Sequence, residues 1–194
     1  AGKLISEGKL PYIDFYAYLT PFYYWFSYFI YQLGENLIFH ARLIGQVIFC
    51  LIFYYTYTFF RINFNSLVSS IATFFSLLVY LSSAAIITYD FTHLITLFSL
   101  ISIVLIINSN NKFGYFFSGV FSSLVFLTKQ SNGFVIFIFL AIIFIVKNRN
   151  DIKKLIYPLS GILITFLIVL YPIILNNGFK DFFLQITLHA GNSK

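Results

Sequence analysis

Residues 155–175 read LIYPLSGILITFLIVLYPIIL, a stretch without a charged side chain. At about 1.5 Å per residue, a helix of this length crosses the roughly 30 Å of hydrocarbon in a lipid bilayer. Residues 43–60, 67–87 and 91–107 form three further apolar runs of spanning length. The pattern predicts an all-α polytopic membrane protein whose core is a bundle of transmembrane helices.

The composition supports this class. Hydrophobic residues make up 60% of the 194 residues, charged residues only 9%, and the mean hydropathy is +0.89. Soluble globular domains carry roughly 25% charged residues, so they are excluded. Aromatic residues reach 22%, which suits interfacial belts and grooves for lipid tails, although the coding bias of an AT-rich genome produces the same enrichment. The single cysteine, Cys50, excludes an internal disulfide and a cysteine metal cluster.

Two apolar runs are shorter. Residues 113–128 and 134–146 lie between the long runs, and the second is too short to cross the hydrocarbon unless polar residues beside it also lie at depth. The polar connector between them, residues 129–133 (KQSNG), then dips below the membrane surface. Such a position is tolerated only where protein buries the connector or water lines it. We therefore expect a polar cavity that opens at this side of the membrane.

The charges separate to two sides if the spans alternate in direction. One side carries the loop cations Arg61, Lys112, Lys147, Arg149, Lys153 and Lys154. The opposite side carries the acids Glu7, Asp14, Glu35, Asp90 and Asp181. Short loops rich in Lys and Arg stay in the cytoplasm, so the acidic side is expected to be the extracytoplasmic face of a bacterial cytoplasmic membrane. Topology accounts for half of the 12 basic residues, so the net charge of +6 requires no nucleic-acid partner.

The chain divides into three predicted parts. Residues 1–39 are expected to form the first extracytoplasmic loop, residues 40–175 a transmembrane bundle of about six spans, and residues 176–194 the start of a further extracytoplasmic loop. Within the first loop, residues 21–33 are predicted to form a helix that begins at Pro21 and stops at Gly34. This helix is too short to span. Its Tyr and Trp residues suit a position in the outer interface, packing against neighbouring helices, or both.

Four short motifs occur along the chain: residues 8–15 (GKLPYIDF), 19–21 (LTP), 40–43 (HARL) and 126–130 (FLTKQ). In this order they resemble the N-terminal half of the GT-C glycosyltransferases. This group includes the dolichyl-phosphate-mannose protein mannosyltransferases of family 39, the aminoarabinose transferases and the bacterial RgtA/B/C/D-like enzymes. No single motif is very specific, but their order, their spacing and the topology agree with the group over most of the chain. The group's first transmembrane helix and everything after its seventh have no counterpart here, so we expect an N-terminal half fragment, in keeping with the absence of Met.

The resemblance implies an enzyme that moves a sugar from a polyprenyl-phosphate-linked donor to a lipid, glycan or protein acceptor on the extracytoplasmic face. A glycosyl phosphate leaves as a stable phosphate, so one base that activates the acceptor hydroxyl is sufficient. Asp14, a lone carboxylate in an apolar and aromatic setting, is the candidate catalytic base. The reaction is expected to pass through an oxocarbenium-like state and to invert the anomeric centre.

The leaving phosphate requires positive charge at the outer interface. The expected topology puts Lys129 and Arg42 there, and both are candidate ligands of the donor phosphate. Lys129 is the stronger candidate because an unpaired cation in a deep connector is costly. Arg42, at the start of its helix, equally suits a side chain that reaches lipid head groups.

Asp90 resembles the second acidic position that many of these enzymes carry in a later outer loop. With Asp14 it is a candidate for binding sugar hydroxyls or a divalent metal ion. It also suits an ordinary N-cap of the helix from Phe91 onward. His40, His93 and His189 show no spacing that indicates a metal site.

Two other classes of membrane protein remain as alternatives: a multispan polysaccharide polymerase or ligase, and a transporter of lipid-linked sugars. A transporter is expected to show internal repeats and charged residues within its spans, and the sequence shows neither. A polymerase or ligase usually has its key residues in a large late loop, which is not found in these residues.

Overall fold

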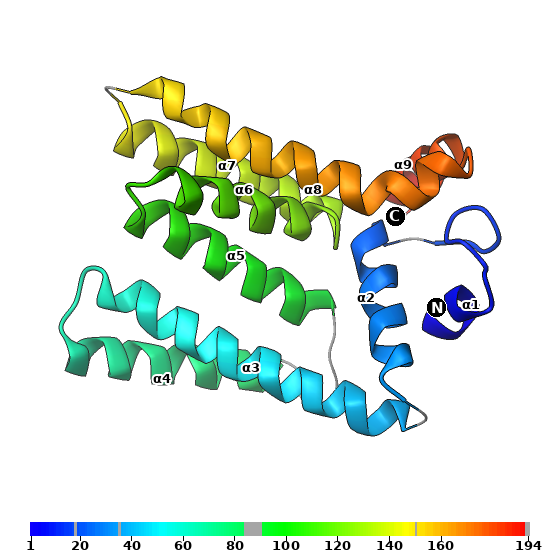
Figure 1. Ribbon diagram of the computed structural model, residues 1–194. Helices are drawn as coiled ribbons and strands as arrows, with labels where there is room; N and C mark the ends of the chain where they lie inside the picture. The colour runs from blue at the N-terminus through cyan, green and yellow to red at the C-terminus, as the bar shows by residue number, and fades with distance from the viewer. Residues whose placement is uncertain (18, 35, 84–90, 150, 193–194) are drawn as a thin grey trace.

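The computed structural model describes residues 1–17, 19–34, 36–83, 91–149 and 151–192 (Figure 1). Over these ranges the chain folds into helices, and the only β-type pairing is an isolated bridge between Pro11 and Phe15. In chain order the elements are α1 (Gly2–Ser6), α2 (Pro21–Gln32), α3 (Leu37–Arg61), α4 (Ser66–Ser83), α5 (Phe91–Asn108), α6 (Lys112–Phe126), α7 (Gln130–Lys147), the 3-10 turn η1 (Ile152–Leu155), α8 (Ile156–Leu175) and α9 (Phe179–Asn192). The all-α prediction is confirmed.

Four stretches are long and apolar enough to cross a membrane: Leu37–Arg61, Phe91–Asn108, Gln130–Lys147 and Ile152–Leu175, the last being η1 and α8 together. They contain three of the four long runs read from the sequence. The remaining run, residues 67–87, lies in α4 as far as residue 83, and its last residues fall outside the described ranges. The chain is therefore a polytopic membrane protein, while the division at residues 39 and 175 stays a prediction.

Helix α7 differs from the sequence expectation. It begins at Gln130, so residues 130–133 of the predicted connector form its first turn, with Lys129 at the N-cap position. Its 18 residues extend about 27 Å, close to the thickness of the hydrocarbon. The apolar run at 134–146 reaches spanning length because its polar flank is helical. The turn between α6 and α7 shrinks to residues 127–129.

Helix α2 lies across one end of the bundle, whereas the helices from α3 to α8 run roughly side by side (Figure 1). It begins at Pro21, whose fixed φ suits the first helical position, and it ends before Gly34, which has a φ of 141°. Trp25 donates a hydrogen bond from Nε1 to the Val169 carbonyl oxygen of α8 at 3.1 Å. The predicted short helix is confirmed, and it packs against the bundle.

The alternation of the helices gives the bundle two distinct ends. The α2 end is formed by residues 7–17, residues 19–20, α2, the α6–α7 turn and α9 (Figure 1). The opposite end holds the turns that follow α3, α5 and α7, and it is called the basic end after Arg61, Lys112, Lys147, Arg149, Lys153 and Lys154. Of the acids expected opposite these cations, Glu7, Asp14 and Asp181 lie in elements of the α2 end.

Helix α6 is the centre of the packing and contacts α5, α7 and α8. Gly119 of α6 lies against the Pro158 carbonyl of α8, and Gly161 of α8 lies against the backbone of α6, so closely that a Cβ atom at either glycine would clash. Ser102 of α5 and Ser118 of α6 each donate a hydrogen bond to the other's carbonyl oxygen, at 2.9 and 3.0 Å. Small residues and internally bonded hydroxyls let helices approach closely in lipid.

Candidate functional site

The loop that carries Asp14 is folded by its own hydrogen bonds. The Asp14 N–H donates to the Leu10 carbonyl oxygen at 2.9 Å, and the Leu10 N–H donates to Asp14 Oδ2 at 2.7 Å. The Tyr12 N–H donates to the Phe15 carbonyl oxygen at 3.0 Å, with Tyr12 in the left-handed region at a φ of 72°. Asp14 itself is exposed. The carboxylate therefore closes this turn and also has the exposed position that proton transfer to or from a substrate needs.

Tyr12 anchors the same loop in the protein. Its side chain is buried, and its phenol donates a hydrogen bond to the Leu19 carbonyl oxygen. Its ring lies edge-on to Tyr24 of α2, at 6.0 Å between centroids, and to Phe182 of α9, at 5.1 Å. Burial, and to a lesser extent the neighbouring Tyr24, raises the pKa of the Tyr12 phenol above its usual range. Tyr12 therefore stays protonated and acts as a permanent donor.

Gln185 of α9 holds the loop from the other side. Its Nε2 donates to the Tyr12 carbonyl oxygen at 2.7 Å, and its Oε1 accepts from the Ala17 N–H at 3.0 Å. One side chain thus satisfies a backbone acceptor and a backbone donor on either side of Asp14. Helix α9 lies within residues 176–194, the predicted start of a further extracytoplasmic loop, and contributes this contact.

The α6–α7 turn joins the first loop at the same end. Thr20 Oγ1 donates to the Phe126 carbonyl oxygen at 3.0 Å, and the Phe22 N–H donates to the Leu127 carbonyl oxygen at 2.9 Å. Two residues further on, the half-buried Lys129 has its Nζ 5.2 Å from the centroid of the Phe91 ring at the start of α5. The first loop, the α6–α7 turn and the start of α5 therefore meet, although they are distant in sequence.

A hollow of about 310 Å³ lies beside this turn, between α5 and α7. Three polar side chains line it: Ser99 of α5, and Ser131 and Asn132 of α7. The remaining lining residues are Ile95, Val135 and Ile136. A partly polar hollow thus lies where the sequence indicated a polar cavity.

The other predicted site residues are less closely connected. Arg42 is exposed on α3, and no hydrogen bond or ion pair links it to Asp14 or Lys129 in the described ranges. Asp90 lies outside those ranges, as does Glu35, so their predicted roles are neither supported nor contradicted. Phe91, which follows Asp90 in the sequence, is the residue that contacts Lys129. The part of the chain that is described contains no group of three or more His, Cys, Asp or Glu side chains arranged to hold a metal ion.

Three residues that organise the α2 end were not recognised as such from the sequence: Tyr12, Thr20 and Gln185. Tyr12 belongs to the same motif as Asp14, and Thr20 belongs to the motif at residues 19–21. Gln185 gave no signal, because a glutamine whose side chain bonds to a distant backbone has no local sequence pattern.

The comparison with family models gives one match. The model described as dolichyl-phosphate-mannose-protein mannosyltransferase matches residues 19–175. This region contains all four candidate spans, Arg42 and Lys129, and it begins after Asp14. Neither the search of curated proteins nor the search of solved structures finds a match.

Proposed function

Since the chain belongs to the dolichyl-phosphate-mannose-protein mannosyltransferase family, we propose that it transfers a sugar from a polyprenyl-phosphate carrier to an acceptor hydroxyl at the α2 end of the bundle. The family makes the chain a membrane glycosyltransferase that uses a lipid-linked sugar donor. It favours this reading over a polymerase, a ligase or a transporter.

The location is supported by the meeting of three segments. Thr20 and Phe22 bond to the α6–α7 turn at 3.0 and 2.9 Å, and Lys129 lies over Phe91. These segments were expected at the site for separate reasons: Asp14 as the base, Asp90 as the second acid and Lys129 as a ligand of the donor phosphate. Their convergence at one end of the bundle is the observation that carries the proposal.

In this proposal Asp14 is the base that removes the proton from the acceptor hydroxyl as the oxygen attacks the anomeric carbon. The bond from that carbon to the phosphate oxygen breaks, and the polyprenyl phosphate leaves with the electron pair. Attack from the side opposite the leaving group inverts the anomeric centre. A stable phosphate needs no protonation by a second carboxylic acid, so a single carboxylate is sufficient for the proton transfer.

Lys129 and Arg42 are proposed to bind the phosphate of the donor. An aromatic ring such as Phe91 holds an ammonium group without neutralising its charge, so the Lys129 cation stays available to an anion. Arg42, exposed near the start of α3, would meet the phosphate from a second helix or reach lipid head groups instead. Asp90 is proposed to bind sugar hydroxyls or a divalent metal ion, because it precedes the Phe91 that contacts Lys129.

The charge distribution supports an extracytoplasmic site. The basic end holds the cations of the α3–α4, α5–α6 and α7–α8 turns, and such turns stay in the cytoplasm. The α2 end is then on the opposite face of the membrane, where the acceptor would be a lipid, a glycan or a protein.

The test is sugar transfer by membranes that contain the full-length protein, from radiolabelled polyprenyl-phosphate sugars to endogenous acceptors. Asp14→Asn is the decisive variant, because the amide oxygen can still accept from the Leu10 N–H while the basic carboxylate is lost. Removal of a general base lowers the rate about a hundredfold to ten-thousandfold. Glu7→Gln, which removes an acid of the same loop, is the matched control and should leave transfer unchanged.

Equal transfer by wild type and Asp14→Asn would exclude Asp14 as the base. Transfer that requires Asp14 but is unaffected by Lys129→Gln would exclude Lys129 as a phosphate ligand. Absence of transfer from every donor, with normal protein levels, would remove the proposal as a whole.

A further inference from the structure

The helices α7 and α8, which follow one another in the chain, are separated by a groove. Both pack extensively on α6, yet they make little contact with each other. The groove between them has a volume of about 400 Å³. Its walls are formed mainly by Phe137, Leu140, Ala141 and Phe144 of α7 and by Pro158, Leu159 and Ile162 of α8. Its floor is formed by the small residues Ser118, Gly119 and Ser122 of α6.

The floor of this groove is effectively apolar although it contains two serines. Ser118 Oγ donates to the Ser102 carbonyl oxygen at 3.0 Å, and Ser122 Oγ donates to the Gly119 carbonyl oxygen at 2.9 Å. The hydroxyl hydrogens are therefore used within the bundle. Water in the groove would find few partners, whereas a hydrocarbon chain would fill it at no cost in lost hydrogen bonds.

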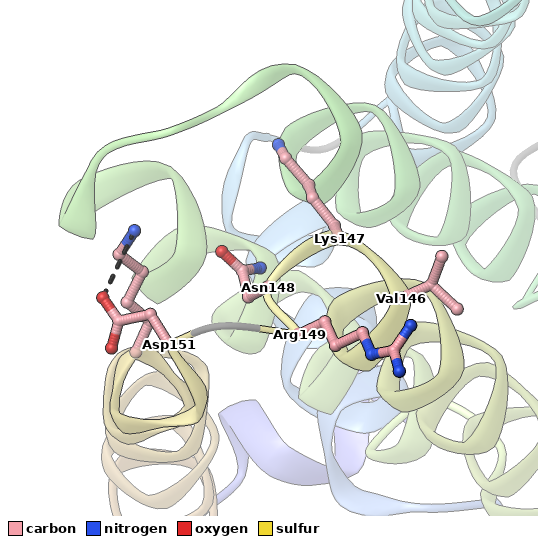
Figure 2. A pocket seen from close by; sticks show the side chains of 6 residues that line it. Val146, Lys147, Asn148, Arg149 and Asp151 are labelled. Carbon is pink, nitrogen blue, oxygen red and sulfur yellow. Dashed lines mark ion pairs between the residues drawn. The ribbon is translucent and has the colours of Figure 1, made fainter.

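A positively charged pocket lies directly beyond one end of the groove. Phe144 and Leu155 line the groove, and the pocket of about 600 Å³ is lined by the residues that connect them: Val146, Lys147, Asn148, Arg149, Asp151 and Lys154 (Figure 2). It belongs to the basic end of the bundle. The two hollows share no lining residue, but they are neighbours: Lys154 of the pocket precedes Leu155 of the groove, and Asn148 of the pocket donates to the carbonyl oxygen of Phe144 in the groove at 3.2 Å.

The cations of this pocket differ in their availability. Lys147 donates to the carbonyl oxygens of Ile106, Ile107 and Ser109 at 2.9, 2.6 and 2.5 Å, so its ammonium is used to close the end of α5. Lys154 pairs with Asp151 at 3.5 Å. The Arg149 guanidinium is directed away from that ion pair in Figure 2, and the described residues offer it no ion-pair partner.

An adjoining pocket extends the positive charge. It has a volume of about 410 Å³, shares Asp151 and Lys154 with the first, and adds Lys112 and Lys153. Asp151 is the only acid that lines either pocket. The two pockets beside the groove therefore carry an excess of positive charge, and they lie where the candidate span Gln130–Lys147 ends.

We propose that this surface binds one anionic glycerophospholipid, with an acyl chain in the groove between α7 and α8 and the anionic head group in the pocket that Arg149 and Lys154 line. An amphiphile with an anionic head and a hydrocarbon tail matches this pair of neighbouring hollows, because one is apolar and the other is positively charged. Basic pockets between helices at the cytoplasmic side of a membrane bind anionic head groups by the same electrostatics. The site is at the opposite end of the bundle from the glycosyl-transfer site and does not depend on it.

The test is lipid binding to the purified full-length protein, measured by native mass spectrometry in detergent with phosphatidylglycerol and phosphatidylcholine as probes. Wild type should bind one phosphatidylglycerol in preference to phosphatidylcholine. Loss of one contributing cation weakens binding about fivefold, so Arg149→Gln should bind phosphatidylglycerol about fivefold more weakly than wild type. The double variant Arg149→Gln, Lys154→Gln should bind it about thirtyfold more weakly. Arg61→Gln, which removes a cation of the same end from a different turn, is the matched control and should bind as wild type does.

The groove is tested separately. Ala141→Phe, and Leu159→Phe on the opposite wall, should fill the groove and reduce phosphatidylglycerol binding without a change of charge. Two variants on opposite walls are used, and thermal melting identifies any variant that does not fold. Equal binding of the two lipids by wild type would overturn the proposal. So would full binding by a folded groove variant, which would indicate head-group attraction alone, or an equal loss in Arg61→Gln.

Discussion

Gln185 should control the order of the loop that carries Asp14. Gln185→Leu keeps the size of the side chain but removes the donor to the Tyr12 carbonyl oxygen and the acceptor for the Ala17 N–H. Ala17 is fully buried, so water does not easily replace the lost partner. The loop is therefore expected to open more often, while the helices of the bundle stay intact.

The size of this effect follows from the two hydrogen bonds. A buried backbone group without a partner costs about 1–3 kcal/mol, and partial access of water reduces the sum for two groups to about 2 kcal/mol. Since about 1.4 kcal/mol corresponds to a factor of ten, the opening equilibrium should increase about thirtyfold. Amide exchange that proceeds through this opening should accelerate by the same factor.

The assay is hydrogen–deuterium exchange of the full-length protein in detergent, followed in peptides that contain Ala17. Thr187→Val is the matched control, because Thr187 lies on the same helix and donates only within it, to the Phe183 and Leu184 carbonyl oxygens. Unchanged exchange at Ala17 in Gln185→Leu would refute the role of Gln185. A uniform acceleration over the helices would instead indicate general destabilisation and would also count against it.

Further predictions concern the packing and pH dependence of the bundle. Tyr12→Phe should lower thermal stability by about 1 kcal/mol, because the phenol loses its carbonyl partner. Folding raises the pKa of the Tyr12 phenol, so the contribution of the phenol to the free energy of unfolding is complete below about pH 10, the ordinary tyrosine value, and decreases progressively above it. The stability deficit of Tyr12→Phe relative to wild type should therefore shrink in melts above that pH. Lys147→Met should cost about 1.5–3 kcal/mol by removing the charged donor to the last carbonyls of α5, and an unchanged melting temperature would contradict this role. Gly119→Val should destabilise by about 1–3 kcal/mol through its clash with the Pro158 carbonyl, and an unchanged melting temperature would contradict this close approach of α6 and α8.

The helices were predictable because apolar length is a local property. The runs at 43–60, 91–107 and 155–175 lie within helices that meet the length and hydropathy of a membrane span. Helix α7 was less predictable, because residues 130–133 are polar and yet helical. Hydropathy indicates where a chain leaves the hydrocarbon, whereas a helix can begin several residues before the apolar run does.

The sequence alone determined that this chain is an all-α membrane protein and, through the order of its motifs, to which family it belongs. Tertiary structure alone decided how the site at the α2 end is held. Thr20 bonds to Phe126 and Gln185 bonds to Tyr12 and Ala17 across 106, 173 and 168 positions of the chain. Contacts between a side chain and a distant backbone group leave no periodic trace in the sequence, because they depend on how whole helices pack and not on the residues beside them.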